Sequence, residues 1–279
     1  MALLTEANIP DCRSDVFLLL GHVLEKSRTG LLAAGGEQVD AVSEAIFRNL
    51  LDRRLQREPV AYIIGEQEFW SLDFMVNRKV LIPRPETEFL LERVISHVKN
   101  RSIPAGRFID LCCGSGVISI VLALELACSV EAVDISAGAL QVTRDNCLRH
   151  GVDNQVRLIC SDLTSCFHSE RDVALVVSNP PYVSRRAIRD ELEPEVARFE
   201  PRLALDGGEE GLDLVRRIRV DLPRILKPGG VVMMEIGFDQ GDAVKSLFQT
   251  GIEGTPSFNE VEILRDYSGR DRVLSAVIE

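Results

Sequence analysis

The chain reads Arg107-Phe108-Ile109-Asp110-Leu111-Cys112-Cys113-Gly114-Ser115-Gly116 at the point where its pattern changes to strand, loop and helix. The first five residues are typical of a buried strand, and an apolar helix is predicted over 117–127. Gly114 and Gly116 let the backbone approach a ligand and leave free N–H groups where that helix begins. The stretch therefore predicts an α/β sheet with a ligand site at this loop.

Acidic residues follow the next two expected strands. Residues 130–133 lead into Asp134, about 20 residues past the glycines, where a carboxylate can accept both hydroxyl groups of an adenosine ribose. Residues 156–160 lead to Asp162, whose carboxylate can accept a hydrogen bond from an exocyclic amine. Each aspartate alone is weak support for a site, because aspartate often caps a strand end.

A fourth expected strand, residues 173–177, runs into Asn179-Pro180-Pro181-Tyr182. The prolines disfavour helical dihedrals at Asn179 and donate no ladder hydrogen bond, so this tetrapeptide is predicted to form a stiff, extended lip. Taken alone, it fits a strand end with a capping Asn and a packed Tyr equally well. Polar groups at the same end of four successive strands indicate a ligand site at the carboxyl edge of the sheet.

The segments after Tyr182 complete the expected sheet. Residues 185–200 are polar and are predicted to hold a helix and a mobile, lid-like loop. A strand is predicted over 231–236 after a further helix. The last two strands, 261–264 and 272–278, are joined by a link too short for a crossover helix, so they are predicted to pair antiparallel.

The N-terminal part has a different pattern. Residues 9–58 carry apolar side chains at helical spacing and predict a small helical bundle within a domain at 1–67. Acidic residues outnumber basic ones in this segment. Docking of a partner by shape is therefore favoured over a nucleic-acid-binding arm.

A β-hairpin linker is predicted over 68–88. Its two strands are expected at 68–76 and 80–82, around a turn at 77–79.

The larger domain is predicted over 89–279 and opens with a helix at 89–100, for which Thr87 is a plausible cap. Arg84 and Glu86 lie beside prolines just before this helix. They fit an interdomain salt bridge as well as they fit a role in the site.

Composition restricts the compartment and the partners. The net charge is −11, with 43 acidic against 32 basic residues, so nothing draws the whole chain to a nucleic-acid backbone. The seven cysteines form neither a CxxC pair nor a zinc-like cluster, which predicts reduced thiols and no metal. No signal-like N-terminus or long apolar run is present, so a cytoplasmic protein without a membrane contact is expected.

In this combination, the chain resembles the class I S-adenosylmethionine-dependent methyltransferases. Their fold is an α/β, seven-stranded, mostly parallel Rossmann-like sheet with an antiparallel C-terminal hairpin. More narrowly, the chain resembles the peptide chain release factor N5-glutamine methyltransferase family. The motifs that carry this resemblance lie at 59–65, 68–69, 82–88, 110–116, 179–182, 205–208, 235–240 and 266–272.

The resemblance implies S-adenosyl-L-methionine as cofactor, S-adenosyl-L-homocysteine as product, and no metal. The turn at 112–116 would line the methionine part, Asp134 would hold the ribose, and Asp162 with Leu163 would border the adenine. The implied cofactor residues are Asp110, Cys112, Cys113, Gly114, Ser115, Gly116, Asp134, Asp162, Leu163 and Asn179. Cys112 and Ser71 stand where the family usually has glycine, and the first departure could alter cofactor affinity.

The implied activity is methylation of the side-chain amide nitrogen, N5, of the glutamine in the Gly-Gly-Gln motif of class I release factors. An amide nitrogen is a poor nucleophile because its lone pair is delocalised. The oxygens of Asn179 and Pro180 are expected to accept its N–H groups and aim the lone pair at the methyl group, while Tyr182 packs on the amide. The implied substrate-binding residues are Asn179, Pro180, Pro181, Tyr182, Arg84 and Glu86, and the implied catalytic residues are Asn179, Pro180 and Tyr182.

The alternative is an N-methyltransferase that acts on an exocyclic amine of adenine or guanine in DNA or RNA, after extruding the base. The acidic balance and the lack of a basic target-recognition segment disfavour it. A binding scaffold without catalysis is disfavoured because the acceptor set is intact. The expected partner is therefore a release factor, docked by the N-terminal domain of a monomer, without direct contact to nucleic acid.

Overall fold

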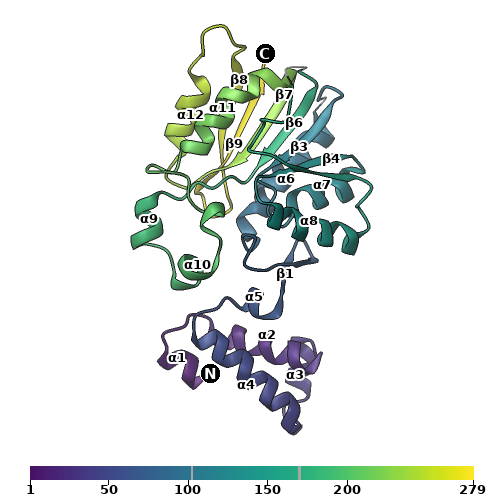
Figure 1. Cartoon of the computed structure of the whole chain (residues 1–279), viewed down its shortest axis with the longest axis vertical. Helices are drawn as coiled ribbons and strands as arrows, with labels where there is room; N and C mark the ends of the chain where they lie inside the picture. Colours follow the sequence, from purple (N-terminus) through teal and green to yellow (C-terminus); the bar gives the residue numbers. More distant parts are fainter. Residues whose placement is uncertain (102, 169–170) are drawn as a thin grey trace. The chain divides into compact units, whose positions relative to one another are not determined.

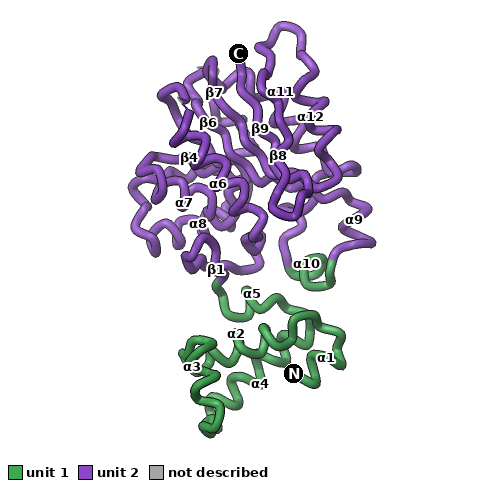
Figure 2. The backbone as a smooth tube through the Cα atoms, turned by 180° about the vertical axis from the view of Figure 1, so that it is seen from behind, with its two compact units in different colours: residues 1–66, 193–199 green, residues 67–192, 200–279 purple. Residues whose placement is uncertain are grey.

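The computed structural model describes residues 1–101, 103–168 and 171–279, which form two compact units (Figure 2). Unit 1 comprises residues 1–66 and 193–199, and unit 2 comprises 67–192 and 200–279. The first boundary falls next to the division expected at residue 67. The segment 193–199 was expected to lie in the larger domain, but its contacts place it in unit 1.

Unit 1 is the helical bundle that the periodicity predicts. Two of its helices begin at capping side chains: Ser27 accepts a hydrogen bond from the N–H of Gly30, and Asp40 accepts from those of Val42 and Ser43. Its helices are α1 (Ala2–Glu6), α2 (Cys12–Leu24), α3 (Arg28–Ala33), α4 (Ala41–Leu55), α5 (Val60–Ile64) and α10 (Pro194–Phe199). Leu4 and Leu19 are fully buried between them.

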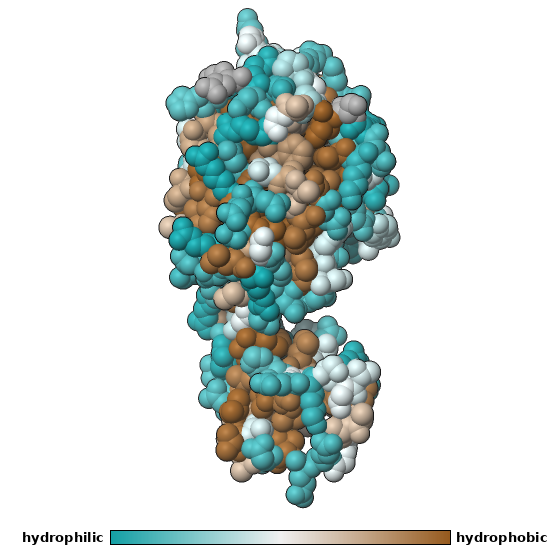
Figure 3. All heavy atoms as spheres, turned by 90° about the vertical axis from the view of Figure 1, so that its right-hand side faces the viewer, coloured by the Kyte–Doolittle hydropathy of each residue, from teal (hydrophilic) through white to brown (hydrophobic). Residues whose placement is uncertain are grey.

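Large apolar side chains also lie on the surface of unit 1. Figure 3 shows hydrophobic residues on this unit, drawn in brown on the face that it displays. Leu18, Leu32, Val42 and Ile46 are each about half exposed or more. None of the helices within the described ranges is long and apolar enough to cross a membrane.

Unit 2 is built on one seven-stranded sheet in the order β5-β4-β3-β6-β7-β9-β8 (Figure 1). The first five of these strands are parallel, and β9 pairs antiparallel with both β7 and β8. The strands are β3 (Arg107–Leu111), β4 (Val130–Asp134), β5 (Val156–Cys160), β6 (Val173–Ser178), β7 (Leu226–Glu235), β8 (Phe258–Arg265) and β9 (Asp271–Ile278). The predicted fold class and the antiparallel C-terminal pair are confirmed.

Helices cover both faces of the sheet (Figure 1). On one face lie α6 (Pro85–Asn100), α7 (Val117–Leu126) and α8 (Ala137–His150), and on the other lie α11 (Asp213–Ile225) and α12 (Gly241–Gln249). The central strand β6 serves both cores: Leu175 and Val177 belong to the first and Val176 to the second. Two short helices, α9 (Arg185–Asp190) and the 3₁₀ helix η1 (Arg202–Ala204), follow β6.

The N-terminal hairpin of unit 2 differs from the prediction. Its strands are β1 (Glu66–Phe69) and β2 (Leu72–Met75), and no strand forms at the expected residues 80–82. The turn lies at Trp70 and Ser71 rather than at 77–79, because both residues have a φ of 56° and so form a tight two-residue turn. The left-handed φ at Ser71 explains why glycine is usual there in the family that the chain resembles.

Helix α6 begins earlier than predicted. Its first residue is Pro85, at a position where proline needs no N–H partner, and its N-cap is Arg84. The prediction that Thr87 caps the helix is therefore wrong. Thr87 is buried in the first turn, and its hydroxyl bonds to a distant strand.

Candidate active site

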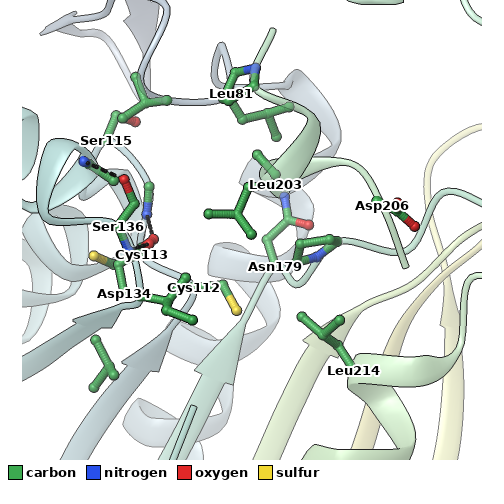
Figure 4. Close-up of a pocket in the computed structure, with 18 of the residues that line it drawn as sticks. Leu81, Cys112, Cys113, Ser115, Asp134, Ser136, Asn179, Leu203, Asp206 and Leu214 are labelled. Atoms are coloured by element: carbon green, nitrogen blue, oxygen red, sulfur yellow. Dashed lines mark hydrogen bonds between the residues drawn. The ribbon is translucent and has the colours of Figure 1, made fainter. Parts of the chain in front are cut away.

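A cavity of about 720 Å³ lies at the carboxyl edge of the parallel strands. Its wall includes Gly114 after β3, Asp134 at the end of β4, Asp162 after β5 and Asn179 after β6, so the four strand ends do meet there. Figure 4 shows Asp134 and Ser136 on one side of the cavity and Asn179 with Leu203 toward the other. All residues that line it belong to unit 2.

The loop after β3 takes its shape from left-handed residues. Gly116 has a φ of 83°, and a Cβ there would lie 2.5 Å from Cγ2 of Thr143 on α8, so only glycine fits. Gly114 has a φ of 57°, and its N–H donates a 3.0 Å hydrogen bond to Oδ2 of Asp134. Cys112 has a φ of 62° although it carries a side chain.

Asp134 is held at the cavity wall by backbone donors. Besides the N–H of Gly114, its carboxylate accepts the N–H of Ser136 at 2.8 Å. Burial raises the pKa of Asp134, and the bonds from Ser136 and Gly114 oppose that rise. A desolvated carboxylate of this kind gains from hydroxyl donors such as those of a ribose.

The other two acidic residues of the expected site, Asp162 and Asp110, lie in different environments. Asp162 lines the cavity and pairs with Arg217 on α11 at 2.8 Å, while Leu163 is buried beside it with a φ of 49°. Asp110 lies fully buried below the loop, where its Oδ2 accepts the N–H and the hydroxyl of Ser119 at 3.1 and 2.6 Å. Asp110 therefore stabilises the start of α7 and is not part of the cavity wall.

The lip after β6 is fixed by long-range hydrogen bonds. Nδ2 of Asn179 donates to Oγ1 of Thr87 at 3.0 Å, and the hydroxyl of Tyr182 donates to Oε1 of Glu235 at 2.9 Å. The carbonyl of Tyr182 accepts a hydrogen bond from Nε2 of Gln240 at 2.9 Å. Burial, together with the carboxylate of Glu235, raises the pKa of Tyr182, which keeps its hydroxyl a donor.

Arg84 and Glu86 lie in different environments in the structure. Arg84 lines the cavity, forms a salt bridge with Glu200 and donates to the carbonyl of Ile82 at 3.0 Å. Arg84 and Glu200 both belong to unit 2, so this salt bridge is not the interdomain one that was expected. Glu86 is exposed, and its role in substrate binding stays a prediction.

The expected site residues divide into two sets. Those that line the cavity are Arg84, Cys112, Cys113, Gly114, Ser115, Asp134, Asp162, Leu163, Asn179 and Pro181. Those that lie outside its wall are Glu86, Asp110, Gly116, Pro180 and Tyr182.

Sequence reasoning assigned no role in the site to Thr87 or Glu235. Both are buried, and together they support Asn179 and Tyr182 from below. Glu235 ends the apolar strand β7, so it is a fifth polar residue at the same sheet edge. That signal was present in the sequence, whereas the contact of Thr87 with a strand 148 residues away was not.

Comparisons with known proteins cover nearly the whole chain. Residues 1–65 match the family described as PrmC N-terminal domain, and residues 85–233 match the methyltransferase small domain. Proteins named release factor glutamine methyltransferase from Caulobacter vibrioides and Bacillus anthracis are each 38% identical to it. The alignments cover 98% of this chain and 92% of the first relative, and 94% and 91% for the second.

Solved structures share the fold at low identity. The hMettl16 catalytic domain, solved in complex with an RNA hairpin, matches with a TM-score of 0.55 at 13% identity over 75% of each chain. A methyltransferase from Pyrococcus furiosus matches with a TM-score of 0.52 at 16% identity over 82% of this chain and 98% of its own. These two support the fold alone. The near-complete alignments to curated relatives show that this chain belongs to the release factor glutamine methyltransferase family.

Proposed function

We propose that this chain transfers a methyl group from S-adenosyl-L-methionine to N5 of the glutamine in the Gly-Gly-Gln motif of class I peptide chain release factors. The observation that carries the proposal is the position of Asn179. Its side chain lies on the wall of a cavity that also presents Gly114, Asp134 and Asp162. An amide acceptor and an adenosine-type binding wall thus share one cavity.

The residues present fit S-adenosylmethionine. The cavity of about 720 Å³ is within the range of about 300–1,000 Å³ found for small-molecule sites. Asp134 would hold the ribose, Asp162 and Leu163 would border the adenine, and the turn at 112–116 would line the methionine part. When bound, the cofactor supplies an electrophilic methyl group on a sulfonium.

The residues of the lip would orient the substrate amide. The oxygen of Asn179 and the carbonyl of Pro180 would each accept one N–H, so that the nitrogen lone pair points at the methyl group. The glutamine nitrogen would form the new N–C bond to the methyl group, the sulfur would keep the electron pair of its former C–S bond, and one amide proton would leave to water. Because that proton becomes strongly acidic only after transfer, no side chain need act as a base.

Unit 1 would dock the release factor. Its exposed apolar side chains, including Leu18, Val42 and Ile46, provide contact area for a protein partner. We further propose that the chain acts as a cytoplasmic monomer, without direct contact to nucleic acid or membrane.

A labelling experiment tests the proposal. The protein is incubated with cofactor labelled in its methyl group and with either a class I release factor or nucleic acid. The label is expected on the factor, and mass spectrometry is expected to place one methyl on the Gly-Gly-Gln glutamine. N179A is expected to abolish transfer while cofactor binding largely survives. Label on nucleic acid, or on another residue of the factor, would refute the proposal.

A further inference from the structure

We infer that Thr87 and Glu235 form a hydrogen-bond relay that sets which way the Asn179 side-chain amide faces. In this relay they are positioning residues, and Asn179 is the group that touches the substrate. The inference rests on the proposed function, because that function gives the oxygen of Asn179 its role as an acceptor.

The relay is short, buried and drawn from three elements. Nδ2 of Asn179, after β6, donates to Oγ1 of Thr87 on α6 at 3.0 Å. Oγ1 of Thr87 donates in turn to Oε2 of Glu235, at the end of β7, at 2.7 Å. Thr87 is 2% exposed and Glu235 is 0% exposed, so water does not compete for these bonds.

The direction of the relay follows from counting protons. Glu235 accepts a hydroxyl at each of its oxygens, from Thr87 and from Tyr182, so the single hydroxyl proton of Thr87 is committed to Glu235. Oγ1 of Thr87 then offers only lone pairs to Asn179, and it can bind the NH₂ group but not the oxygen. The amide of Asn179 must therefore turn its oxygen away from Thr87. None of the described residues donates a hydrogen bond to that oxygen, which leaves it for a substrate N–H.

The second oxygen of Glu235 also favours donation from Thr87 to Glu235. Oε1 accepts the hydroxyl of Tyr182 at 2.9 Å, so both carboxylate oxygens are occupied by donors. A flipped Asn179 would place its oxygen against the lone pairs of Thr87 and would present two N–H donors to a substrate amide that also donates. The relay thus excludes the orientation that cannot bind a carboxamide nitrogen.

Single substitutions at Thr87 test the relay. T87V keeps the shape of the side chain but removes the acceptor for Asn179, so we expect kcat to fall about tenfold, the cost of one lost hydrogen bond, with cofactor affinity unchanged. T87S keeps the hydroxyl and is expected to restore most of kcat. T164V is the matched control, because Thr164 is equally buried and donates to the carboxylate of Asp221 at 2.6 Å without contacting Asn179. It is expected to leave kcat within about twofold of the parent.

A reversal of polarity gives the sharper test. In N179D, two carboxylates compete for the one Thr87 proton. In E235Q, the new NH₂ group can donate to Thr87, whose proton then points at Asn179 and turns its amide the wrong way. Each single variant is expected to lose at least about tenfold in kcat.

In E235Q/N179D the relay runs in reverse, from the amide at 235 through Thr87 to the carboxylate at 179, which keeps an oxygen toward the substrate. The double variant is therefore expected to exceed both single variants in kcat.

The outcomes separate the relay from the proposed function. Additive losses in E235Q/N179D, or T87V with the kcat of the parent, would overturn the relay even if N179A is inactive. If the parent transfers no label to glutamine, or if N179A is as active as the parent, the proposed function fails and the inference falls with it. Should T87V not fold, as judged by its circular dichroism and cofactor binding, the comparison of E235Q, N179D and their combination decides alone.

Discussion

Arg54 on α4 donates a 2.9 Å hydrogen bond to Glu195 on α10, which lies 141 residues later in the chain. The same guanidinium donates to Asp15 on α2 at 2.7 Å, and Arg57 adds a bond to Glu195 at 3.2 Å. The side chains of Arg54 and Glu195 are only 6% and 10% exposed. This buried cluster holds residues 193–199 in unit 1 although the residues on both sides of them belong to unit 2.

Removal of Arg54 should therefore destabilise unit 1. R54M leaves Asp15 buried without its cation and leaves Glu195 paired with Arg57, and the loss of a buried partner costs about 3–5 kcal/mol of the free energy of unfolding. We expect hydrogen exchange to speed up in residues 1–66 and 193–199 together. R48M is the control on the same helix, because Arg48 is exposed and pairs only with Glu44 in the described part of the chain. It should cost less than about 1 kcal/mol. Equal effects of the two variants would contradict the role of the cluster.

Replacement of Cys112 by glycine should stabilise unit 2. Cys112 has a φ of 62°, a conformation that costs a residue with a side chain about 1–2 kcal/mol. Glycine removes that strain but gains entropy in the unfolded chain, so we expect C112G to raise the free energy of unfolding by about 0.5–1 kcal/mol in denaturant titrations. C112A keeps the strain and removes only the thiol. A gain in C112A as large as in C112G would show that the thiol, not the backbone, is responsible.

The stability of unit 2 should fall with rising pH because of Asp110. Burial raises the pKa of this carboxyl from 3.8 to about 7, so the folded state holds a proton that the unfolded chain has already lost. The stabilisation is fully present below pH 3.8 and is lost as the pH rises through about 7, a decrease of about 4 kcal/mol at about 1.4 kcal/mol per pH unit.

D110N isolates that contribution. Its side-chain oxygen can still accept both bonds from Ser119, but it does not titrate. The difference in free energy of unfolding between D110N and the parent should therefore shift in favour of the variant between pH 4 and pH 7. A difference that stays constant over this range would contradict the raised pKa.

Local patterns predicted most of the sheet and the edge at which the cavity lies. Apolar runs followed by Gly114, Asp134, Asp162 and Asn179 were sufficient to place four strand ends at one cavity, because parallel strands end at the same edge. The turn at Trp70 and Ser71 was missed, since neither residue type is typical of a left-handed φ.

Features that depend on distant partners could not be predicted in the same way. Residues 193–199 read as part of the larger domain because their decisive partner, Arg54, lies 141 residues away. Thr87 read as a helix cap because capping is the local use of a threonine before an apolar helix. Only the fold shows that its hydroxyl bonds to Glu235.

The relay through Thr87 and Glu235 should also make kcat fall at acidic pH. Burial raises the pKa of Glu235, opposed by the bonds from Thr87 and Tyr182 and by the charge of Arg272, while the charge of Glu86 adds to the rise. As the pH falls through this raised pKa, Glu235 gains a proton and can donate to Thr87, which frees the Thr87 proton to turn Asn179 the wrong way. We therefore expect kcat, measured at saturating cofactor and release factor, to decrease on the acidic side in the parent. In T87V the relay is cut, so kcat should be lower but nearly independent of pH over the same range. An acidic limb of the same position and depth in T87V would assign the titration to a group other than Glu235.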